Sequence, residues 1–312
     1  MLASLSKAFF HALSRSRTLK KLASRYGMRR PSGFARRFIA GETVADAIDA
    51  ARALEARGMS HTLDLLGESV TTLEAADAAT RAYLAAVDAI VQAGIERNIS
   101  LKLTQLGLDA DKASAVDNLR KILERAEPAG FFVRIDMENS SYTDVTLDVF
   151  ETLWHYGHRA IGVVLQSELY RSERDLQHLN ALGASVRLVK GAYKEPKTVA
   201  YQRKADVDHA YARMVKTLLS AGTYPAIATH DPAMIDLARA WARTHGIGPD
   251  RFEFQMLYGI RRDLQAMLLS EGCRVRIYVP FGREWFPYFM RRLAERPANV
   301  LFVARGVVGE RG

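Results

Sequence analysis

Two adjoining segments near the end of the chain read Arg274-Val-Arg-Ile-Tyr-Val-Pro-Phe-Gly282 and Tyr288-Phe-Met-Arg-Arg-Leu293. The first resembles a β-strand, and the second has the character of a helix. On a helix, Tyr288, Arg291 and Arg292 fall at positions i, i+3 and i+4, so their side chains share one face. Neighbouring guanidinium groups repel unless an anion lies between them, so this face is a candidate anion clamp. A solvated basic surface helix is the alternative, and the rest of the chain has to decide between the two.

Seven similar runs precede this strand, and helical segments separate them. The eight runs cover residues 61–66, 99–103, 131–136, 161–166, 186–190, 226–230, 252–257 and 274–279. Helical periodicity occupies intervening segments such as 72–97, 113–127 and 199–221. Because each parallel strand needs a crossover helix to return the chain, this alternation predicts an α/β fold, a (β/α)8 TIM-type barrel. A doubly wound Rossmann sheet is the alternative, but no Gly-x-Gly-x-x-Gly or Walker sequence occurs.

The size of the chain suits one barrel with additional N-terminal helices. It has 312 residues, 48% of them hydrophobic, and single barrels of about 250 residues are common. We expect residues 1–59 to form a basic arm and helices, and residues 60–312 to form the barrel. Residues 38–59 are predicted to be an amphipathic helix, in which Thr43 is the N-cap and Asp46 completes a capping box. The single cysteine, Cys273, excludes an intrachain disulfide.

The excess positive charge lies at one end of the sequence. The net charge is +9, yet residues 1–37 hold ten Lys and Arg and no acid, so the remainder is nearly neutral. A neutral body argues against nucleic-acid binding, which needs a basic surface. Leu and Phe residues alternate with these bases, so the arm could lie on anionic lipid, dock on the barrel, or act as a targeting segment.

Polar residues stand where the predicted strands end. In TIM-type barrels the active site lies at the C-terminal mouth of the strands. The second to eighth runs end with Lys102, Asp136, Gln166, Arg187 and Lys190, Thr229 and His230, Gln255, and Tyr278. One His and one Asp among three cations do not make a metal-ligand set, so we expect no metal. A cationic mouth instead predicts an anionic substrate and a cofactor that carries phosphates.

Seven motifs, one per barrel unit and in order, resemble those of the monofunctional bacterial proline dehydrogenases over most of residues 33–305. They are Leu101-Lys-Leu-Thr-Gln-Leu-Gly107, Ile135-Asp-Met-Glu138, Arg187-Leu-Val-Lys-Gly-Ala-Tyr193, Ala228-Thr-His-Asp231, Phe254-Gln-Met-Leu-Tyr-Gly-Ile-Arg261, Tyr278-Val-Pro-Phe-Gly282 and Tyr288-Phe-Met-Arg-Arg292. The resemblance implies a distorted barrel that uses FAD to oxidise L-proline to Δ1-pyrroline-5-carboxylate. Hydride would pass from proline C5 to flavin N5, and the electrons would pass to a membrane quinone.

The resemblance also implies a role for individual residues. Non-covalent FAD would be held by Met137, Gln166, Arg187, Lys190, Gly191, Ala192, Thr229 and His230. The proline carboxylate would be held by Lys102, Arg291 and Arg292, and the ring would be walled by Leu257, Tyr278 and Tyr288. The residues expected to take part in catalysis are Asp136, Arg187 and Tyr278. Because three cations over-neutralise one carboxylate, we expect Asp136 and Glu284 to share them.

The expected setting is cytoplasmic, with the enzyme peripheral on the inner face of the bacterial membrane. The resemblance is weakest over the first 32 residues, which carry this expectation. Two other functions stay open at this stage. One is a dehydrogenase of hydroxyproline or another cyclic imino acid, although a bulky Tyr278 phenol near ring C4 would exclude a 4-hydroxyl group. The other is a nucleic-acid-binding protein that uses the basic arm.

Overall fold

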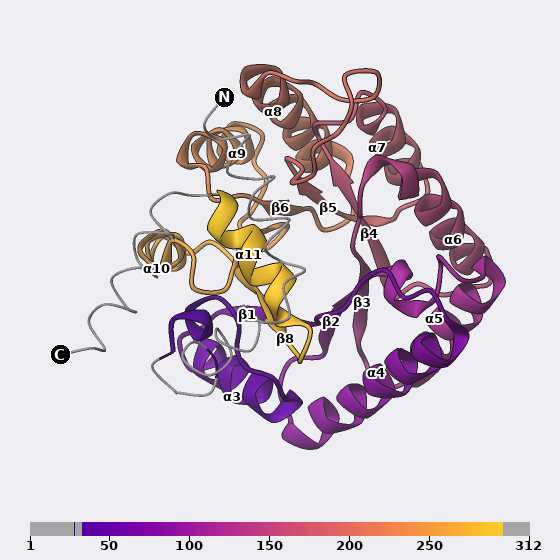
Figure 1. Cartoon of the computed structure of the whole chain (residues 1–312). Coiled ribbons are helices and arrows are strands. Elements are labelled where there is room, and N and C mark those ends of the chain that lie inside the picture. Colours follow the sequence, from indigo (N-terminus) through magenta and orange to yellow (C-terminus); the bar gives the residue numbers. More distant parts are fainter. Residues whose placement is uncertain (1–27, 29–32, 296–312) are drawn as a thin grey trace.

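The computed structural model of the chain describes Met28 and residues 33–295. Eight parallel strands form a closed barrel in chain order, with β8 paired to β1 (Figure 1). The strands are β1 (Ser60–Leu65), β2 (Asn98–Leu101), β3 (Phe132–Ile135), β4 (Ile161–Gln166), β5 (Ser185–Val189), β6 (Ala226–Ala228), β7 (Glu253–Leu257) and β8 (Val275–Phe281). The predicted barrel is confirmed, and the doubly wound sheet is excluded.

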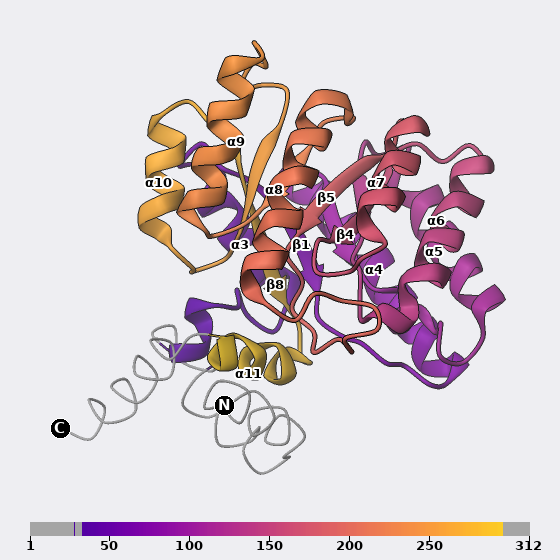
Figure 2. The same cartoon turned by 90° about the horizontal axis from the view of Figure 1, so that it is seen from above.

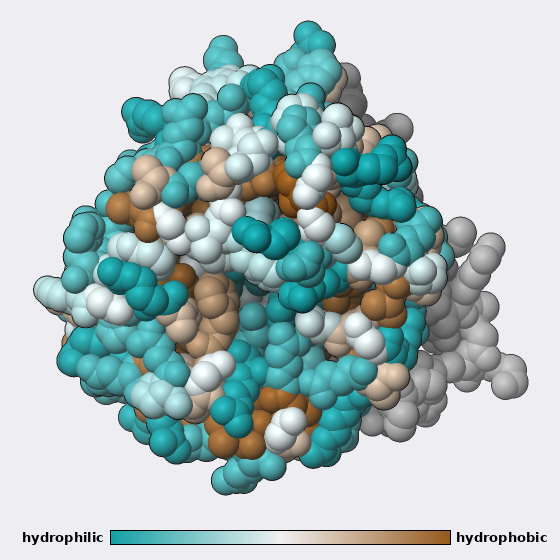
Figure 3. All heavy atoms as spheres, turned by 180° about the vertical axis from the view of Figure 1, so that it is seen from behind, coloured by the Kyte–Doolittle hydropathy of each residue, from teal (hydrophilic) through white to brown (hydrophobic). Residues whose placement is uncertain are grey.

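Helices form a ring around the strands, as Figure 1 shows. They are α4 (Leu73–Ala93), α5 (Lys112–Ala126), α6 (Thr143–His155), α7 (Ser172–Ala181), α8 (Lys204–Ala221), α9 (Pro232–Thr244) and α10 (Arg262–Ser270). Short 3-10 turns are η2 (Phe34–Arg37), η3 (Leu103–Leu106) and η4 (Ser140–Tyr142). On the side opposite the barrel mouth, hydrophilic residues predominate and apolar residues form separate patches (Figure 3).

Two helices depart from a regular barrel. Helix α3 (Val44–Glu55) precedes the first strand and contacts both β1 and β8 from outside. Helix α11 (Trp285–Glu295), which follows the last strand, lies across the end of the barrel where the strands finish (Figures 1 and 2). Helix α3 thus packs outside β8, where the last helix of a regular barrel would lie, and α11 covers the mouth instead (Figure 1).

A separate apolar cluster holds α11 in this place. Phe38, Trp285 and Phe289 pack together, with ring centroids of Phe38 and Phe289 6.2 Å apart and those of Trp285 and Phe289 5.9 Å apart. Trp285 is fully buried, and its Nε1 donates to Glu42 Oε1 over 2.9 Å. The main core lies elsewhere, between the outward faces of the strands and the helical ring.

The predicted helix over residues 38–59 is too long at both ends. The helix spans only Val44–Glu55, and its capping box of Thr43 and Asp46 is present as predicted. Residues 38–43 form a turn and a loop instead, in which the amide of Ala40 donates to the carbonyl of Pro280, and the amide of Gly282 donates to the carbonyl of Gly41. This segment thus continues the hydrogen bonding of β8 beyond the barrel.

The helix predicted over residues 199–221 begins later, at Lys204. Ala200 forms an antiparallel bridge with Leu169, and the amide of Tyr201 donates to the carbonyl of Glu168. These bonds between two mouth loops keep residues 199–203 out of the helix. The other elements agree within a few residues, and Lys102, Thr229 and His230 lie just beyond the strands that they were expected to end.

Candidate active site

The interior of the barrel is polar. Successive strand residues point to opposite faces of the sheet, and the outward set is buried against the helices, for example Leu63, Ile99, Val133, Phe254 and Ile277. Bonds between strands that are not neighbours have to cross the interior. Arg187 on β5 makes such bonds to Ser100 on β2 and to Asp136 after β3. Most barrels of this type fill the same space with branched aliphatic side chains. In this barrel, polar and charged side chains fill it instead.

Asp136 is at the centre of the group at the mouth. Its Oδ1 accepts from Arg187 Nη1 over 2.7 Å, and its Oδ2 accepts from the Tyr278 hydroxyl over 2.7 Å. Lys102 Nζ lies 3.8 Å from the same Oδ2. The Arg187 guanidinium carbon is 5.4 Å from the centroid of the Tyr278 ring. The four predicted residues Lys102, Asp136, Arg187 and Tyr278 therefore come together.

The protonation of this group follows from burial and neighbouring charge. Burial raises the pKa of Tyr278 well above its usual value, and the charges of Asp136 and Asp64 raise it further. The phenol therefore stays protonated near neutral pH and donates to Asp136. Burial opposes the charge on Lys102, but Asp64 and Asp136 outweigh burial and raise its pKa. Lys102 is consequently a fixed cation.

Asp64 belongs to the site but was not predicted. It is fully buried on β1, and its Oδ1 lies 3.5 Å from Lys102 Nζ. Burial raises the pKa of Asp64, and the Lys102 charge opposes that rise. The signal was present in the sequence, because Thr62 and Asp64 alternate with apolar residues in the run 61–66. Polar residues on alternate positions of a buried strand mark a polar interior.

A cavity of about 90 Å³ lies beneath α11. Its lining comes from α11, its preceding loop, the loop after β1 and Lys102: Leu66, Gly67, Glu68, Lys102, Glu284, Pro287, Tyr288 and Arg291. The predicted shared face of α11 thus turns Tyr288 and Arg291 to the mouth. The Arg292 guanidinium carbon lies 5.1 Å from the centroid of the Tyr288 ring.

The acidic partners differ in part from those expected. Asp136 lies beside Lys102, and Glu284 lines the cavity. Arg291 pairs instead with Glu68, whose Oε1 accepts from Arg291 Nη1 over 2.7 Å. Burial opposes the charge of Arg291, and Glu68 raises its pKa in spite of burial. Glu68 lies in a loop after β1, where no sequence period marks it.

Tyr193 is a further residue of the mouth. It follows β5 in one of the motifs quoted above but received no role from the sequence. Burial raises its pKa to about 12, while the positive charges of Lys102 and Arg291 act to lower it. Its phenol is therefore protonated near neutral pH and lies within electrostatic reach of two cations of the cavity.

The residues predicted to hold a cofactor occupy one arc of the mouth. They follow four consecutive strands: Met137 after β3, Gln166 at the end of β4, Lys190, Gly191 and Ala192 after β5, and Thr229 and His230 after β6. Lys190 Nζ donates to Asp208 over 2.5 Å and to Asp231 over 2.6 Å. His230 Nε2 accepts from the amide of Leu257 over 2.9 Å. The arc is continuous because the strands follow chain order around the barrel.

The remaining predicted residues occupy the opposite arc. Lys102 follows β2, Leu257 ends β7, Tyr278 lies on β8, and Tyr288 and Arg291 come from α11. Leu257 and Tyr278 pack against the apolar cluster that anchors α11. Asp136 lies where the two arcs meet, and the guanidinium of Arg187 reaches it from β5 across the barrel. The arrangement can therefore hold an extended ligand along β3 to β6 and a small anion beneath α11.

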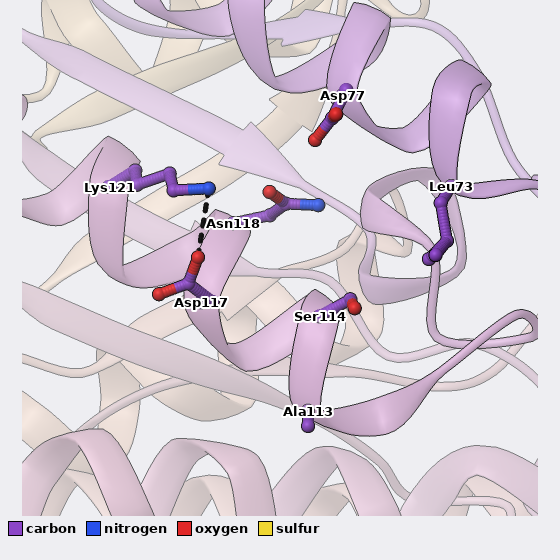
Figure 4. Close-up of a pocket in the computed structure, with 7 residues that line it drawn as sticks. All are labelled: Leu73, Asp77, Ala113, Ser114, Asp117, Asn118 and Lys121. Carbon is purple, nitrogen blue, oxygen red and sulfur yellow. Dashed lines mark ion pairs between the residues drawn. The ribbon is translucent and has the colours of Figure 1, made fainter.

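A larger cavity, of about 380 Å³, lies away from the mouth between α4 and α5 (Figure 4). Its polar side chains include Asp77, Asn118 and Lys121, and Lys121 Nζ pairs with Asp117 over 2.8 Å. All of these residues come from the outer helical layer. No strand end contributes to it, so the mouth is the better candidate for chemistry.

Comparison with known proteins identifies relatives. The family model described as Proline dehydrogenase matches residues 47–305. Proline dehydrogenase of Deinococcus radiodurans is 46% identical over 88% of this chain and 90% of its own length, and proline dehydrogenase 2 of Bacillus subtilis is 42% identical over 97% and 99%. A crystal structure of proline utilization A from Bdellovibrio bacteriovorus, inactivated by N-propargylglycine, has a TM-score of 0.79 at 28% identity. The match extends over 89% of this chain and 34% of the proline utilization A chain.

Proposed function

The chain belongs to the proline dehydrogenase family of oxidoreductases, and on this basis we propose that it oxidises L-proline to Δ1-pyrroline-5-carboxylate with non-covalently bound FAD. One observation carries the proposal. Lys102, Asp136, Arg187 and Tyr278 form a bonded group at the mouth, and α11 brings Arg291 over the same cavity. A small anion and a reducible cofactor would meet at this group.

The cations beneath α11 suit a carboxylate. Lys102 and Arg291 both line the cavity, and charge-assisted bonds from such groups are the strong ones. Arg292 would complete the set from the next position of the helix. Asp64, Asp136 and Glu68 already balance much of this charge. Three acids thus stand against three cations, so the carboxylate would be held by local charge-assisted bonds and not by a large excess of positive charge.

The arc formed by the residues after β3 to β6 would hold FAD. Within the part of the chain that the structure describes, Gln166 Oε1 is buried and has no hydrogen-bond donor, so a ligand N–H would satisfy it. Gly191 has a φ of +117°, a conformation that glycine adopts without strain, which lets the backbone turn sharply after β5. FAD would be held by these residues together with Met137, Arg187, Lys190, Ala192, Thr229 and His230. Two carboxylates bind Lys190, so a phosphate there would share its ammonium with them.

The chain's own residues would orient the reactants and exclude water. A bound FAD would accept the hydride that leaves proline C5. Loss of that hydride needs the nitrogen lone pair, so proline would react with its amine deprotonated. Arg187 is fixed by Asp136 at the meeting point of the two arcs, where a guanidinium stabilises developing negative charge. The Tyr278 phenol stays protonated near neutral pH and therefore cannot take up a proton, so its role would be to hold Asp136 and wall the ring.

The bulk of Tyr278 supports proline as the substrate over 4-hydroxyproline. Its ring packs against the α11 cluster and beneath Arg187. A hydroxyl on C4 of the substrate would need space that the phenol occupies. Leu257 packs against the same cluster, so this side of the site offers an apolar surface to the ring carbons.

We also propose that the electrons pass to a membrane quinone and that the enzyme works at the cytoplasmic face of the bacterial membrane. None of the helices in the described part of the chain has the length and apolar character needed to cross a bilayer. The basic arm supports peripheral binding, since about 1 kcal/mol per basic residue is available near anionic lipid. Residues 1–27 and 29–32 of the arm lie outside the described residues. Removing residues 1–32 should abolish sedimentation with anionic liposomes, and equal sedimentation of both forms would refute the membrane role.

The Arg292→Ala variant tests the carboxylate assignment. Truncating one partner of a charge pair costs roughly 2–5 kcal/mol, so we expect KM for proline to rise by about two orders of magnitude while flavin content stays normal. Arg283→Ala is the matched control, because Arg283 is exposed in the loop before α11. Loss of flavin from the Arg292→Ala variant, or a rise in KM of the same size in both variants, would contradict the assignment.

A further inference from the structure

The guanidinium of Arg187 is held on all three of its nitrogens. Nη1 donates to Asp136 over 2.7 Å, Nη2 donates to Ser100 Oγ over 3.0 Å, and Nε donates to Gln255 Oε1. Its side chain is 6% exposed. The three acceptors come from three different parts of the barrel wall: the residue directly after β3, β2 and β7. A planar group bound in this way cannot tilt or rotate without breaking a bond.

Gln255 has only one workable orientation. Its Oε1 has to face Arg187, because a guanidinium only donates hydrogen bonds. Its Nε2 donates to Glu253 Oε1, and a carboxylate only accepts. Gln255 and Glu253 are two residues apart on β7, so both side chains lie on the inward face. The amide therefore links the guanidinium at the mouth to a carboxylate deeper in the barrel.

Glu253 is held in turn by Arg276 on β8. Arg276 Nε donates to Glu253 Oε1 over 2.7 Å, and its Nη2 donates to Oε2 over 3.0 Å. This bidentate pair fixes the carboxylate plane. Burial alone would raise the pKa of Glu253, but Arg276 outweighs burial and the net direction is downward. Glu253 is therefore a stable anion.

The series of bonds ends at the opposite side of the barrel from the mouth. Arg276 Nη1 donates to the carbonyl of His61 and to Glu96 Oε1, both over 2.7 Å. Glu96 precedes β2 and is partly exposed, whereas Gln255, Glu253 and Arg276 are buried. A continuous series of hydrogen bonds thus runs from Glu96 through Arg276, Glu253 and Gln255 to Arg187.

We propose that Gln255 is a positioning residue that sets the orientation of the Arg187 guanidinium toward the cofactor, and that the Glu253–Arg276 pair holds Gln255 in place. The inference rests on the proposed function, in which Arg187 faces a flavin. Without Gln255, Arg187 keeps only its two Nη bonds and can rotate about them. A tilted guanidinium stabilises the negative charge of a reduced flavin less well, so reduction becomes less favourable.

A purely structural role is the competing explanation. A buried amide costs free energy unless it is paired, and any variant at position 255 could lower stability for that reason alone. The reduction potential of the bound flavin separates the two explanations, because loss of stability by itself does not change it. Glu96 offers a matched control, since it belongs to the same series but lies at the end away from Arg187.

The experiment compares wild type, Gln255→Met and Glu96→Gln as flavin-loaded proteins. We expect Gln255→Met to lower the equilibrium constant for flavin reduction at least tenfold, which is about 30 mV for a two-electron couple. Its kcat should fall while KM for proline stays within about threefold, since the carboxylate site is separate. Glu96→Gln should lower the melting temperature and leave the potential unchanged.

Gln255→Asn serves if Gln255→Met does not fold, because the shorter amide cannot reach both Arg187 and Glu253. The same tenfold loss is expected. A potential that equals that of wild type in the variant at 255 would overturn the inference, as would an equal shift in Glu96→Gln. If wild type itself binds no flavin, or holds a flavin that proline does not reduce, the proposed function fails instead, and the two failures are therefore distinct.

Discussion

A single carboxylate, that of Asp136, accepts hydrogen bonds from Arg187 and Tyr278 and lies near Lys102. The sequence allowed this group to be predicted because polar residues gather toward the ends of the predicted strands, and parallel strands bring their ends to one mouth. In the structure Lys102 and Asp136 directly follow β2 and β3, whereas Arg187 and Tyr278 lie within β5 and β8. That rule did not find Glu68, nor Asp64, which only the alternation of polar and apolar residues in β1 marks as an inward residue. Asp64 lies one residue before the end of β1, and Glu68 lies in the loop that follows β1. Neither position is marked by the rule that found the others.

The Tyr278→Phe variant tests the bond to Asp136. Phenylalanine keeps the ring and removes the hydroxyl, so a buried carboxylate loses one donor at a cost of about 1.5–3 kcal/mol. We expect kcat/KM for proline to fall by roughly ten- to a hundredfold, with flavin content unchanged. Tyr170→Phe is the control, because the Tyr170 hydroxyl donates to the Lys197 carbonyl at an exposed position. An unchanged kcat/KM in Tyr278→Phe would show that the bond has no catalytic part.

At the scale of elements, periodicity located the strands and helices and misjudged some of their ends. The helix predicted over residues 38–59 shortened to Val44–Glu55, because Ala40 and Gly41 bond to the end of β8 and to Gly282 directly after it. The position of α11 over the mouth also could not be read from its own sequence. It depends on Phe38 and Glu42, which lie about 250 residues earlier and contact Phe289 and Trp285. The pattern of apolar residues in a helix predicts which face is buried, but it does not predict which distant segment packs against that face.

The junction of α3 with β1 predicts a pH dependence of stability. His61 is fully buried at the start of β1, and its Nε2 lies 3.0 Å from Glu55 Oε1 at the end of α3. Its Nδ1 has no partner among the described residues. Burial lowers the pKa of His61, against the opposing effect of Glu55 and Glu96 and with help from Arg276.

The unfolded chain therefore takes up a proton on His61 near pH 6.5, while the folded protein does so only at lower pH. Stability should fall as pH drops below that value, by at most about 1.4 kcal/mol per unit. Urea unfolding at pH 7.5 and 5.5 measures the change. His61→Asn should flatten the dependence, and His155→Asn, at an exposed site on α6, should leave it unaltered. An equally steep dependence in His61→Asn would contradict this account.

At the scale of the whole molecule, eight alternations of strand and helix were enough to predict a closed barrel. They could not show how the interior is filled. The bond between Arg187 and Ser100 joins residues 87 positions apart on strands that are not neighbours. Alternation of polar and apolar residues places such side chains inside, but the pairing across the barrel depends on strand register and side-chain reach. The interior is thus where the structure adds most to the sequence.

The central claim is that this barrel binds a flavin that L-proline reduces. The most direct measurement is the visible absorption spectrum of the purified protein, recorded before and after L-proline is added without oxygen. We predict the two visible bands of an oxidised flavin and their bleaching by proline. A colourless protein that reconstitution with FAD cannot rescue, or a flavin spectrum that proline leaves unchanged, would contradict the claim.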